Sequence, residues 1–359
     1  MKDKTITLLG ASGYTGSLIA EKLNALNIKF SLAGRNAESL SQLRIKTGID
    51  RPVHLVDITD PKQVDSLLEQ SNILINCVGP FNLFGKILVE KCSQKKITYL
   101  DITGEQEIVK YSYENLNTIA KKSGATIAHS ISFESCLADL LAERIIHKAI
   151  TYKEISTYYQ FERSRPSPGT KLTMKLSRFY PSYYLDNNEL KCIRTFELKK
   201  NVEFKSLPEY SRALFMPYPE VIFFSRKYNV TDSASFLLMT EDEAAIAKNK
   251  SQPEKITFED IINKHFRIKN HGPSETERRM QSFRLIVNAI QENNVQTNIM
   301  LNGVDMYGIT AELMAYAVKN LIQTSVYKTG IISPGEIFND FDVIDKIMSK
   351  YNMEIALNI

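Results

Sequence analysis

Short apolar runs alternate with longer amphipathic stretches over the first 130 residues of the chain. A run of four or five apolar residues is typical of a strand buried on both faces, and each longer stretch has the apolar spacing of a helix. This alternation predicts βαβ units in a doubly wound parallel sheet, because such crossovers are right-handed. The predicted strands are 6–9, 30–33, 53–56, 73–77, 98–102 and 126–129, and the predicted helices are 14–26, 37–47, one that begins at Pro61, 85–93 and one that ends at Lys122.

The pattern changes after a predicted helix over 136–149, where the strand-like runs become longer. Such runs lie at 155–161, 192–198, 235–239 and 295–301, and their spacing indicates a mainly antiparallel sheet with flanking helices. A periodic helix over 310–323, a turn over 330–336 and a last helix over 337–349 follow. We therefore predict an α/β chain with a Rossmann domain over 1–150, an inserted α+β domain for substrate binding or dimerisation over 151–304, and C-terminal helices over 305–359 that return to the Rossmann domain.

The composition is that of a globular protein, with 43% hydrophobic residues, 24% charged residues and a formal net charge of +4. This charge balance does not indicate a nucleic-acid partner. The four cysteines form no C-x-x-C pair and no histidine pair has the spacing of zinc ligands, so we expect no metal site. No window holds the roughly 18 uninterrupted apolar residues of a membrane span. We expect a soluble cytoplasmic protein without a transmembrane segment, and the sequence leaves peripheral membrane contact and a homodimer open.

The sharpest motif is G-A-S-G-Y-T-G at residues 10–16, between the first predicted strand and the first predicted helix. Backbone N–H groups in such a loop approach a pyrophosphate, and the helix N-terminus adds unpaired donors. The spacing is G-x-x-G-x-x-G rather than G-x-G-x-x-G, and the alternative is a tight turn without a ligand. The predicted cofactor-binding residues in this loop are Gly10, Ser12, Gly13, Tyr14, Thr15 and Gly16.

The end of the second predicted strand distinguishes NADP from NAD. The segment reads L-A-G-R-N at residues 32–36 and holds no carboxylate that could bind a ribose 2′-hydroxyl. Arg35 is placed to pair with a 2′-phosphate, and Asn36 is placed to assist it. Asp57, after the third strand, is predicted to contact the adenine. The alternatives are a solvated arginine and an acid at a helix N-terminus.

The loop after the fourth predicted strand reads N-C-V-G-P-F at residues 76–81. Ligands of such sheets bind at the carboxyl ends of the strands, so Cys77, Gly79 and Pro80 are predicted to pass beside the nicotinamide ribose. The next strand ends in Y-L-D-I-T-G-E at residues 99–105, which brings two carboxylates and a hydroxyl to the same edge.

In this order these motifs resemble the saccharopine dehydrogenase-like oxidoreductases. Later segments, S-F-E-S at 132–135, G-P-S-E at 272–275, Y-G-I-T-A at 307–311 and I-S-P-G at 332–335, are similar to the branch of trans-acting enoyl reductases. The resemblance implies NADP(H) as the cofactor and reductase chemistry, in one branch on the double bond of a lipid or polyketide-derived substrate. Gly10, Gly13, Gly16 and Arg35 match the family's cofactor motif. Ser132 stands where the family often has glycine, and Glu134 where it often has aspartate.

Reduction of a C=C or C=O bond requires a proton donor beside the nicotinamide. The catalytic candidates are Glu105, Glu134, Ser135 and Tyr307, each with the alternative of a helix cap or a core side chain. His129 ends a strand and either faces the site or is simply packed. The aromatic segments at 179–184 and 216–224 are interpreted as core and dimer packing, with an apolar pocket or interface for a lipid-like substrate as the alternative.

We predict an NADP(H)-dependent oxidoreductase that acts on a small, apolar or acyl-type substrate. Two alternatives stay open at this point. One is a regulatory protein that senses NADP(H) without turnover. The other is a peripheral lipid-binding protein with a vestigial cofactor site, which an exposed apolar patch within residues 183–224 would favour.

Overall fold

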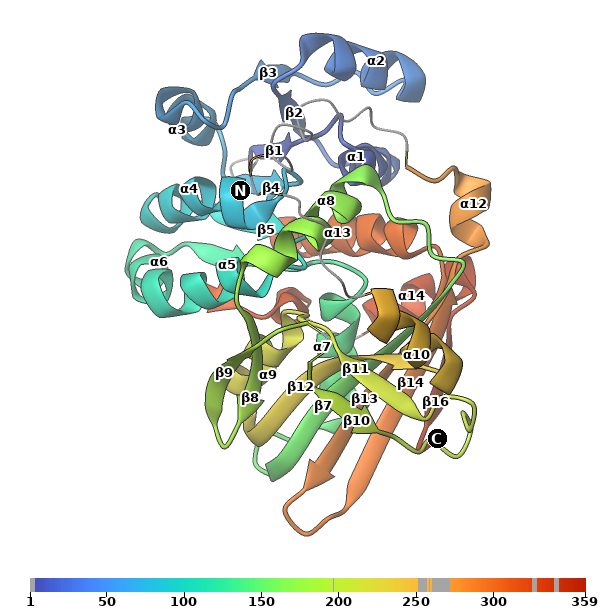
Figure 1. The fold of residues 1–359 in the computed structure, drawn as a ribbon. Coiled ribbons are helices and arrows are strands. Elements are labelled where there is room, and N and C mark those ends of the chain that lie inside the picture. The colour runs from blue at the N-terminus through green and yellow to red at the C-terminus, as the bar shows by residue number, and fades with distance from the viewer. Residues whose placement is uncertain are drawn as a thin grey trace. The chain divides into compact units, whose positions relative to one another are not determined.

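The chain folds into two compact units, shown in Figure 1. The computed structural model describes residues 4–195, 197–250, 257, 259, 272–324, 328–338 and 342–359. Unit 1 comprises residues 1–104, 108–136 and 307–343, and unit 2 comprises residues 105–107, 137–306 and 344–359. The units follow spatial contacts, so they differ from the three predicted segments: most of the helix after residue 135 and the last sixteen residues group with unit 2.

Unit 1 contains sheet A, a seven-stranded sheet in which all pairs of neighbouring strands are parallel. The strand order is β15-β6-β5-β4-β1-β2-β3, so the chain reverses direction across the sheet between β1 and β4. The predicted doubly wound parallel sheet is thus confirmed. Its strands are β1 (Ile6–Leu9), β2 (Ser31–Gly34), β3 (Val53–Leu55), β4 (Ile73–Asn76), β5 (Thr98–Asp101), β6 (Thr126–Ala128) and β15 (Gly330–Ile332).

Helices cover both faces of sheet A, with α3, α4 and α6 on one face and α1 and α13 on the other (Figure 1). Two of these helices begin with a side-chain N-cap. The Asn36 side chain accepts the Ser39 N–H at the start of α2, and Asp60 caps α3 ahead of Pro61. The helical elements are α1 (Tyr14–Ala25), α2 (Ala37–Thr47), α3 (Pro61–Glu69), α4 (Phe81–Gln94), α5 (Gln106–Tyr111), the π-helical turn η1 (Ser112–Leu116), α6 (Asn117–Ser123), α13 (Met306–Gln323) and the 3-10 turn η3 (Pro334–Ile337).

Unit 2 contains sheet B, whose main path runs β10-β11-β12-β7-β13-β14-β16. A side branch adds β8 against β12 and β9 against β8. Only β7 and β12 pair in parallel among the described strand pairs, so the predicted mainly antiparallel sheet is confirmed. Its strands are β7 (Thr151–Glu162), β8 (Ser182–Asp186), β9 (Glu189–Ile193), β10 (Lys199–Asn201), β11 (Arg212–Phe215), β12 (Asn229–Met239), β13 (Ser282–Gln291), β14 (Gln296–Val304) and β16 (Glu354–Leu357).

Short helices connect these strands, and tight turns join the hairpins. Asn187 and Asn188 both adopt positive φ (51° and 64°) between β8 and β9, which is the backbone of a two-residue hairpin turn. The helical elements are α7 (Ser135–Ile145), α8 (Pro168–Leu176), the 3-10 turn η2 (Ser177–Phe179), α9 (Glu220–Lys227), α10 (Glu241–Lys250), α12 (Glu275–Arg279), α14 (Val343–Ile347) and the 3-10 turn η4 (Met348–Tyr351).

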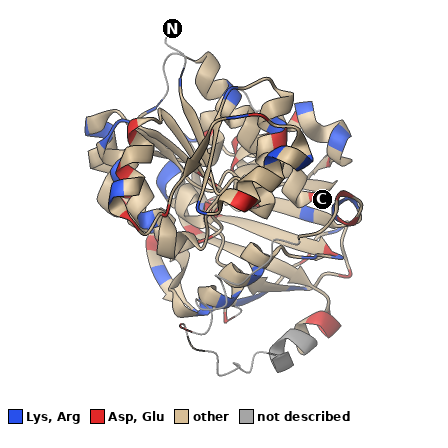
Figure 2. Cartoon of the chain, turned by 90° about the horizontal axis from the view of Figure 1, so that it is seen from above, with Lys and Arg blue, Asp and Glu red and all other residues tan. Residues whose placement is uncertain are grey.

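Basic and acidic residues are interspersed along the part of the chain that is coloured in Figure 2. Such mixing agrees with the small formal net charge of +4. Across the residues that the structure describes, no helix is long and apolar enough to cross a membrane. Within the same residues, no group of three or more His, Cys, Asp or Glu side chains is arranged to hold a metal ion.

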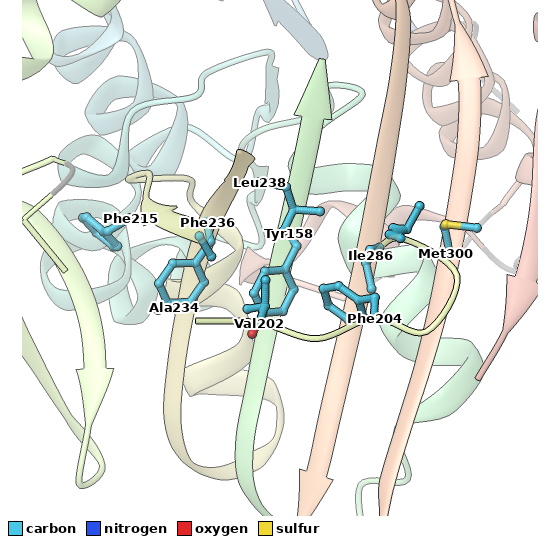
Figure 3. Close-up of a cluster of buried hydrophobic side chains, with 11 residues drawn as sticks. Tyr158, Val202, Phe204, Phe215, Ala234, Phe236, Leu238, Ile286 and Met300 are labelled. Carbon is cyan, nitrogen blue, oxygen red and sulfur yellow. The ribbon is translucent and has the colours of Figure 1, made fainter. Parts of the chain in front are cut away.

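One face of sheet B is buried by an apolar cluster, drawn in Figure 3. Tyr158 on β7 lies at its centre, stacked on Phe236 of β12 with ring centroids 5.4 Å apart. Phe204, from the segment that lies across the strands in Figure 3, meets the Tyr158 ring edge-on at 5.2 Å. Of the predicted aromatic segments, Tyr183 is 6% exposed and Val221–Phe224 are fully buried, whereas Phe179 is 43% exposed. Among the described residues of 183–224, no large hydrophobic side chain is exposed.

Alternating residues of the same strands form a polar cluster around Glu220, which is fully buried at the start of α9. Its Oε1 atom accepts hydrogen bonds from the hydroxyls of Thr157 and Ser235 at 2.8 Å and of Tyr159 at 2.7 Å. Thr157 and Ser235 pair directly between β7 and β12. Three hydroxyl donors compensate the desolvation of one carboxylate.

Several predicted elements need correction. Residues 330–336 are not a turn: the buried Ile331 and Ile332 belong to β15, which pairs with β6, and 3-10 turn η3 follows. α4 begins at Phe81 instead of 85, because the Gly79–Pro80 turn already directs the chain into the helix. The predicted strand at 192–198 ends at Ile193, and residue 196 lies outside the described residues. The predicted helix over 337–349 is confined to α14 and η4, and residues 339–341 lie outside the described residues. Strand β16 was not predicted.

Candidate functional site

The carboxyl edge of sheet A collects the loops that follow its parallel strands. Register pairs join Leu9 to Ala33 and to Asn76, so the loops after β1, β2 and β4 begin side by side. Because β1 lies between β2 and β4, where the strand order reverses, this edge is the topological switch point at which α/β sheets bind ligands. All the predicted cofactor-binding residues lie on the loops after β1, β2, β3 and β4 or in the first turn of α1.

The loop after β1 and the first turn of α1 are packed so closely that a side chain would clash at two of their glycines. Gly10 has a φ of +77°, and a Cβ atom there would lie 2.9 Å from Cγ2 of Val78, in the loop after β4. A Cβ atom at Gly16 would lie only 2.2 Å from the carbonyl oxygen of Gly10. Gly13 is the N-cap of α1 and donates its N–H to Gly10 at 2.9 Å. The first N–H groups of α1 therefore adjoin a compact loop built on glycines, which is the arrangement that an anion such as a pyrophosphate requires.

The loop after β2 places an exposed guanidinium at this edge. Arg35 directly follows Gly34, the last residue of β2, and no carboxylate stands at that strand end. Asn36 uses its side-chain oxygen to cap α2, accepting the Ser39 N–H at 2.8 Å. Asn36 therefore caps α2, and its role at the cofactor stays a prediction.

Asp57 lies near Arg35. The Thr59 hydroxyl donates to the Asp57 carboxylate at 2.7 Å, and the Thr59 N–H donates to the same carboxylate at 2.9 Å. These two hydrogen bonds, together with the charge of the nearby Arg35, lower the pKa of the Asp57 carboxyl from its ordinary value. An ionised Asp57 repels a phosphate and attracts the nearby Arg35 guanidinium. The predicted contact of Asp57 with the adenine stays a prediction.

The loop after β4 is held against β1 and contains a cis Gly79–Pro80 peptide bond. The Cys77 N–H donates to the Leu9 carbonyl at 2.9 Å, and the Val78 N–H donates to the Asn76 side chain at 2.9 Å. Burial raises the pKa of the Cys77 thiol, so the thiol stays protonated. This loop therefore offers a fixed backbone surface next to the glycine loop, with no reactive thiolate.

A buried polar network lies at the ends of β5 and β6, and sequence reasoning missed it. His129 donates or accepts at both ring nitrogens, with Nδ1 2.7 Å from Asp101 Oδ2 and Nε2 2.9 Å from the Ser112 hydroxyl. Ser112 begins the π-helical turn η1, an irregularity of the kind that often accompanies functional sites. The Tyr99 hydroxyl accepts the Asn76 side-chain N–H at 3.0 Å, and burial together with Asp101 raises the pKa of Tyr99 well above its ordinary value. His129 is thus packed and fully hydrogen-bonded.

The four catalytic candidates come from the segment after β5, the start of α7 and the first turn of α13. Tyr307, in the first turn of α13, meets the ring of Tyr14 edge-on at 5.0 Å within unit 1. Glu134 and Ser135 lie at the start of α7, half-buried and buried respectively. Glu105 groups with unit 2, where its carboxylate accepts the Thr173 hydroxyl at 3.3 Å. Their catalytic roles stay predictions.

Comparison with known proteins gives the following similarities. Residues 6–128 match the family model of the saccharopine dehydrogenase NADP binding domain. A saccharopine dehydrogenase-like oxidoreductase of Bos taurus is 28% identical over 152 residues, 38% of this chain and 35% of that protein. A trans-acting enoyl reductase of Mycobacterium tuberculosis is 29% identical over 150 residues, 40% of this chain and 36% of that protein. The apo saccharopine dehydrogenase (L-Glu forming) of Saccharomyces cerevisiae has a similar structure, with a TM-score of 0.61, 14% identity and 99% of each chain covered.

These similarities cover different shares of the chain. The family match contains every predicted cofactor-binding residue and confirms NADP(H) as the cofactor. The likeness to the yeast structure extends over nearly the whole chain and confirms the fold. The chain spans only about a third of the length of the two curated relatives, 35% and 36%.

Proposed function

We propose that this chain, whose residues 6–128 form an NADP-binding domain of the saccharopine dehydrogenase type, is an NADP(H)-dependent oxidoreductase. The observation that carries the proposal is the juxtaposition of the close-packed glycine loop with Arg35 across the switch point between β1, β2 and β4. When bound, NADP(H) supplies or accepts a hydride at its nicotinamide. The protein then has to bind the cofactor, orient it and provide a proton.

Each predicted residue has a distinct part in cofactor binding. The backbone of residues 10–16 and the hydroxyls of Ser12 and Thr15 hold the pyrophosphate at the start of α1. Arg35 pairs with the 2′-phosphate, and its planar guanidinium is suited to two parallel hydrogen bonds. Cys77, Gly79 and Pro80 form the wall beside the nicotinamide ribose. Asn36 and Asp57 hold the loops around Arg35.

The proposed reaction is reduction of a C=C or C=O bond in an apolar or acyl-type substrate. The name of the mycobacterial relative, a trans-acting enoyl reductase, supports the C=C alternative. Tyr307 is the favoured proton donor of the four candidates, because it packs against Tyr14 in the cofactor loop. A cytoplasmic location and a homodimer stay predictions from the sequence.

A second function, NADP(H) sensing without turnover, is favoured by one observation. His129 and Asp101 form the acid–base pair at the carboxyl edge, yet both side chains are fully buried and bonded to each other. A general acid must reach its substrate. Consumption of NADPH with a panel of enoyl and carbonyl compounds supports the oxidoreductase, and tight NADPH binding without consumption supports the sensor.

Replacing Arg35 by alanine is expected to weaken NADPH binding about 10- to 100-fold, because hydrogen bonds to a charged phosphate contribute about 1.5–3 kcal/mol. NADH lacks the 2′-phosphate, so its affinity is expected to be weak and unchanged by the substitution. Isothermal titration of wild type and variant with both nucleotides measures this difference.

The matched control is Arg44→Ala. Arg44 is also exposed, lies on α2 and pairs with Asp50. This variant is expected to bind NADPH as wild type does. Failure of wild type to bind either nucleotide would overturn the proposed function, and equal loss of NADPH and NADH affinity in Arg35→Ala would overturn the assignment of the 2′-phosphate to Arg35.

A further inference from the structure

A basic segment without acidic residues leads into α8 and through it, the light green helix of Figure 1. Between Glu162 and Asp186 the chain has no aspartate or glutamate, but it has five basic residues. These are Arg163, Arg165, Lys171, Lys175 and Arg178. The formal net charge of the whole chain is only +4, so positive charge is concentrated in this segment.

Three of these basic residues form one exposed face of the helix, which we call the basic face of α8. Lys171, Lys175 and Arg178 are exposed, and they follow the i, i+4, i+7 spacing of a single helix face that continues from α8 into η2. Leu172 and Leu176 are buried and anchor a different side of α8 in the protein. The three cations extend over about 10 Å along the helix axis, so at physiological ionic strength they act together on a charged surface.

The charge of the basic face is not neutralised by the part of the chain that the structure describes, where none of its three cations forms an ion pair. Arg165 differs from them, because it pairs with Glu277. Glu105 reaches α8 on another side, where its carboxylate accepts the Thr173 hydroxyl. The basic face therefore presents uncompensated positive charge to its surroundings.

Two exposed apolar side chains accompany these cations. Met174 lies between Lys171 and Lys175 on the same side of α8 and is 57% exposed, and Phe179, at the end of η2, is 43% exposed. Helices that lie on a membrane surface combine such features, because apolar side chains enter the boundary of the acyl chains while lysine and arginine reach the lipid phosphates. The face therefore combines the two properties that binding to an anionic lipid surface requires.

We propose that the basic face of α8, together with Met174 and Phe179, docks on a lipid surface that carries anionic headgroups. Such a surface presents uniform negative charge above an apolar layer, which complements cations and apolar side chains along one helix. An acidic protein is a poorer match, because lysine is depleted at protein interfaces and complementary charges fix their register. This inference goes beyond the proposed function and does not depend on NADP(H) binding.

Sedimentation with vesicles tests the inference. The protein is mixed, without nucleotide, with vesicles of phosphatidylcholine alone or of equal parts phosphatidylcholine and phosphatidylserine. We expect wild type to bind the anionic vesicles, more weakly as the salt concentration rises, and not to bind the neutral vesicles.

Two variants separate the contributions of charge and apolar contact. The triple variant Lys171→Gln, Lys175→Gln, Arg178→Gln is expected to bind the anionic vesicles about 100-fold more weakly, because each basic residue near the surface contributes about fivefold. Met174→Gln keeps the length of the side chain and is expected to weaken binding about threefold, since the side chain no longer enters the apolar layer.

The matched control is the triple variant Lys62→Gln, Lys121→Gln, Lys122→Gln. These lysines are also exposed, they lie on α3 and α6, and their replacement changes the net charge by the same amount. The control is expected to bind the anionic vesicles as wild type does. Equal losses in the two triple variants would overturn the inference, as would wild type that binds polyglutamate but not the anionic vesicles, which would favour an acidic protein as the partner.

Thermal unfolding and NADPH titration keep this test separate from that of the proposed function. The substituted side chains of α8 are exposed and lie outside the cofactor loops, so the Tm and the NADPH affinity of the triple variant are expected to match wild type. Wild type that binds anionic vesicles but no nucleotide would overturn the proposed function alone. Wild type that binds NADPH but not the vesicles would overturn this inference alone.

Discussion

Replacing Lys227 by methionine is expected to lower the free energy of unfolding by about 3–5 kcal/mol, because it leaves buried carboxylates without their cation. The Lys227 ammonium, 5% exposed at the end of α9, lies 2.5 Å from both Asp139 and Glu143. These two carboxylates are 0% and 15% exposed and stand four residues apart on α7. Methionine keeps the apolar part of the lysine side chain, so the loss of stability is due to the missing charge and not to a cavity. Urea unfolding measures the effect.

Lys191→Met is the matched control for this substitution. The Lys191 ammonium is also 2.5 Å from a carboxylate, that of Asp186, but the lysine side chain is 43% exposed. Water screens an exposed pair, so no measurable change in stability is expected. Similar losses in the two variants would contradict the argument that burial makes the Lys227 cluster strong.

The same cluster predicts a dependence on pH. Burial alone would lower the pKa of the Lys227 ammonium, but Asp139 and Glu143 outweigh burial and hold the pKa above its ordinary value of 10.5. A pKa raised in the folded state means that the proton stabilises the fold. The difference in stability between wild type and Lys227→Met should therefore shrink as the pH rises above 10.5. A difference that grows above pH 10.5 would contradict this sign.

Local patterns were sufficient to predict the frame of unit 1. Each strand of the first half is a short apolar run, and each helix start carries its own signal, as with Asp60 and Pro61 at α3. Because parallel strands direct their carboxyl ends to one edge, the loops that contain Gly10, Arg35 and Cys77 could be placed together before the structure was known. To predict the positions of these residues, only the order of neighbouring elements is required, and the sequence contains that order.

Elements that depend on partners far along the chain could not be predicted in this way. Strand β15 is three residues long and pairs with β6, where the Thr126 hydroxyl donates to the Lys328 carbonyl 202 residues away. A run this short between glycine and proline resembles a turn when it is considered alone. The hydroxyls around Glu220 likewise come together only through the register of β7 against β12.

Burial was the property of the candidate site that the sequence did not reveal. His129 looked the same as a solvated strand-end histidine until its contacts with Asp101 and Ser112 were known. Ser130 and Ser132 are ordinary loop residues by type. Only their burial without a partner separates them from capping serines such as Ser274, whose hydroxyl accepts the Glu277 N–H. The surroundings of these three side chains could therefore be known only from the structure.

Gly16→Ala is expected to weaken NADPH binding about 100-fold while unit 1 remains folded. A Cβ atom at this position would lie 2.2 Å from the Gly10 carbonyl oxygen, so the loop has to move by about 1 Å to restore van der Waals contact. Such a movement lengthens the hydrogen bonds from the start of α1 to the pyrophosphate. Loss of two bonds to a charged group, about 1.5 kcal/mol each, corresponds to this decrease in affinity.

The control for Gly16→Ala is a glycine with space around it. A Cβ atom at Gly169, in the first turn of α8, would meet its nearest neighbour at 3.9 Å. Gly169→Ala is therefore expected to bind NADPH as wild type does and to unfold at the same or a higher temperature. For Gly16→Ala, overpacking is expected to lower stability by about 1–3 kcal/mol, so circular dichroism must first show a folded protein. A folded Gly16→Ala variant with wild-type NADPH affinity would mean that the close packing of this loop serves the fold alone, and the pyrophosphate would have to bind elsewhere on the carboxyl edge.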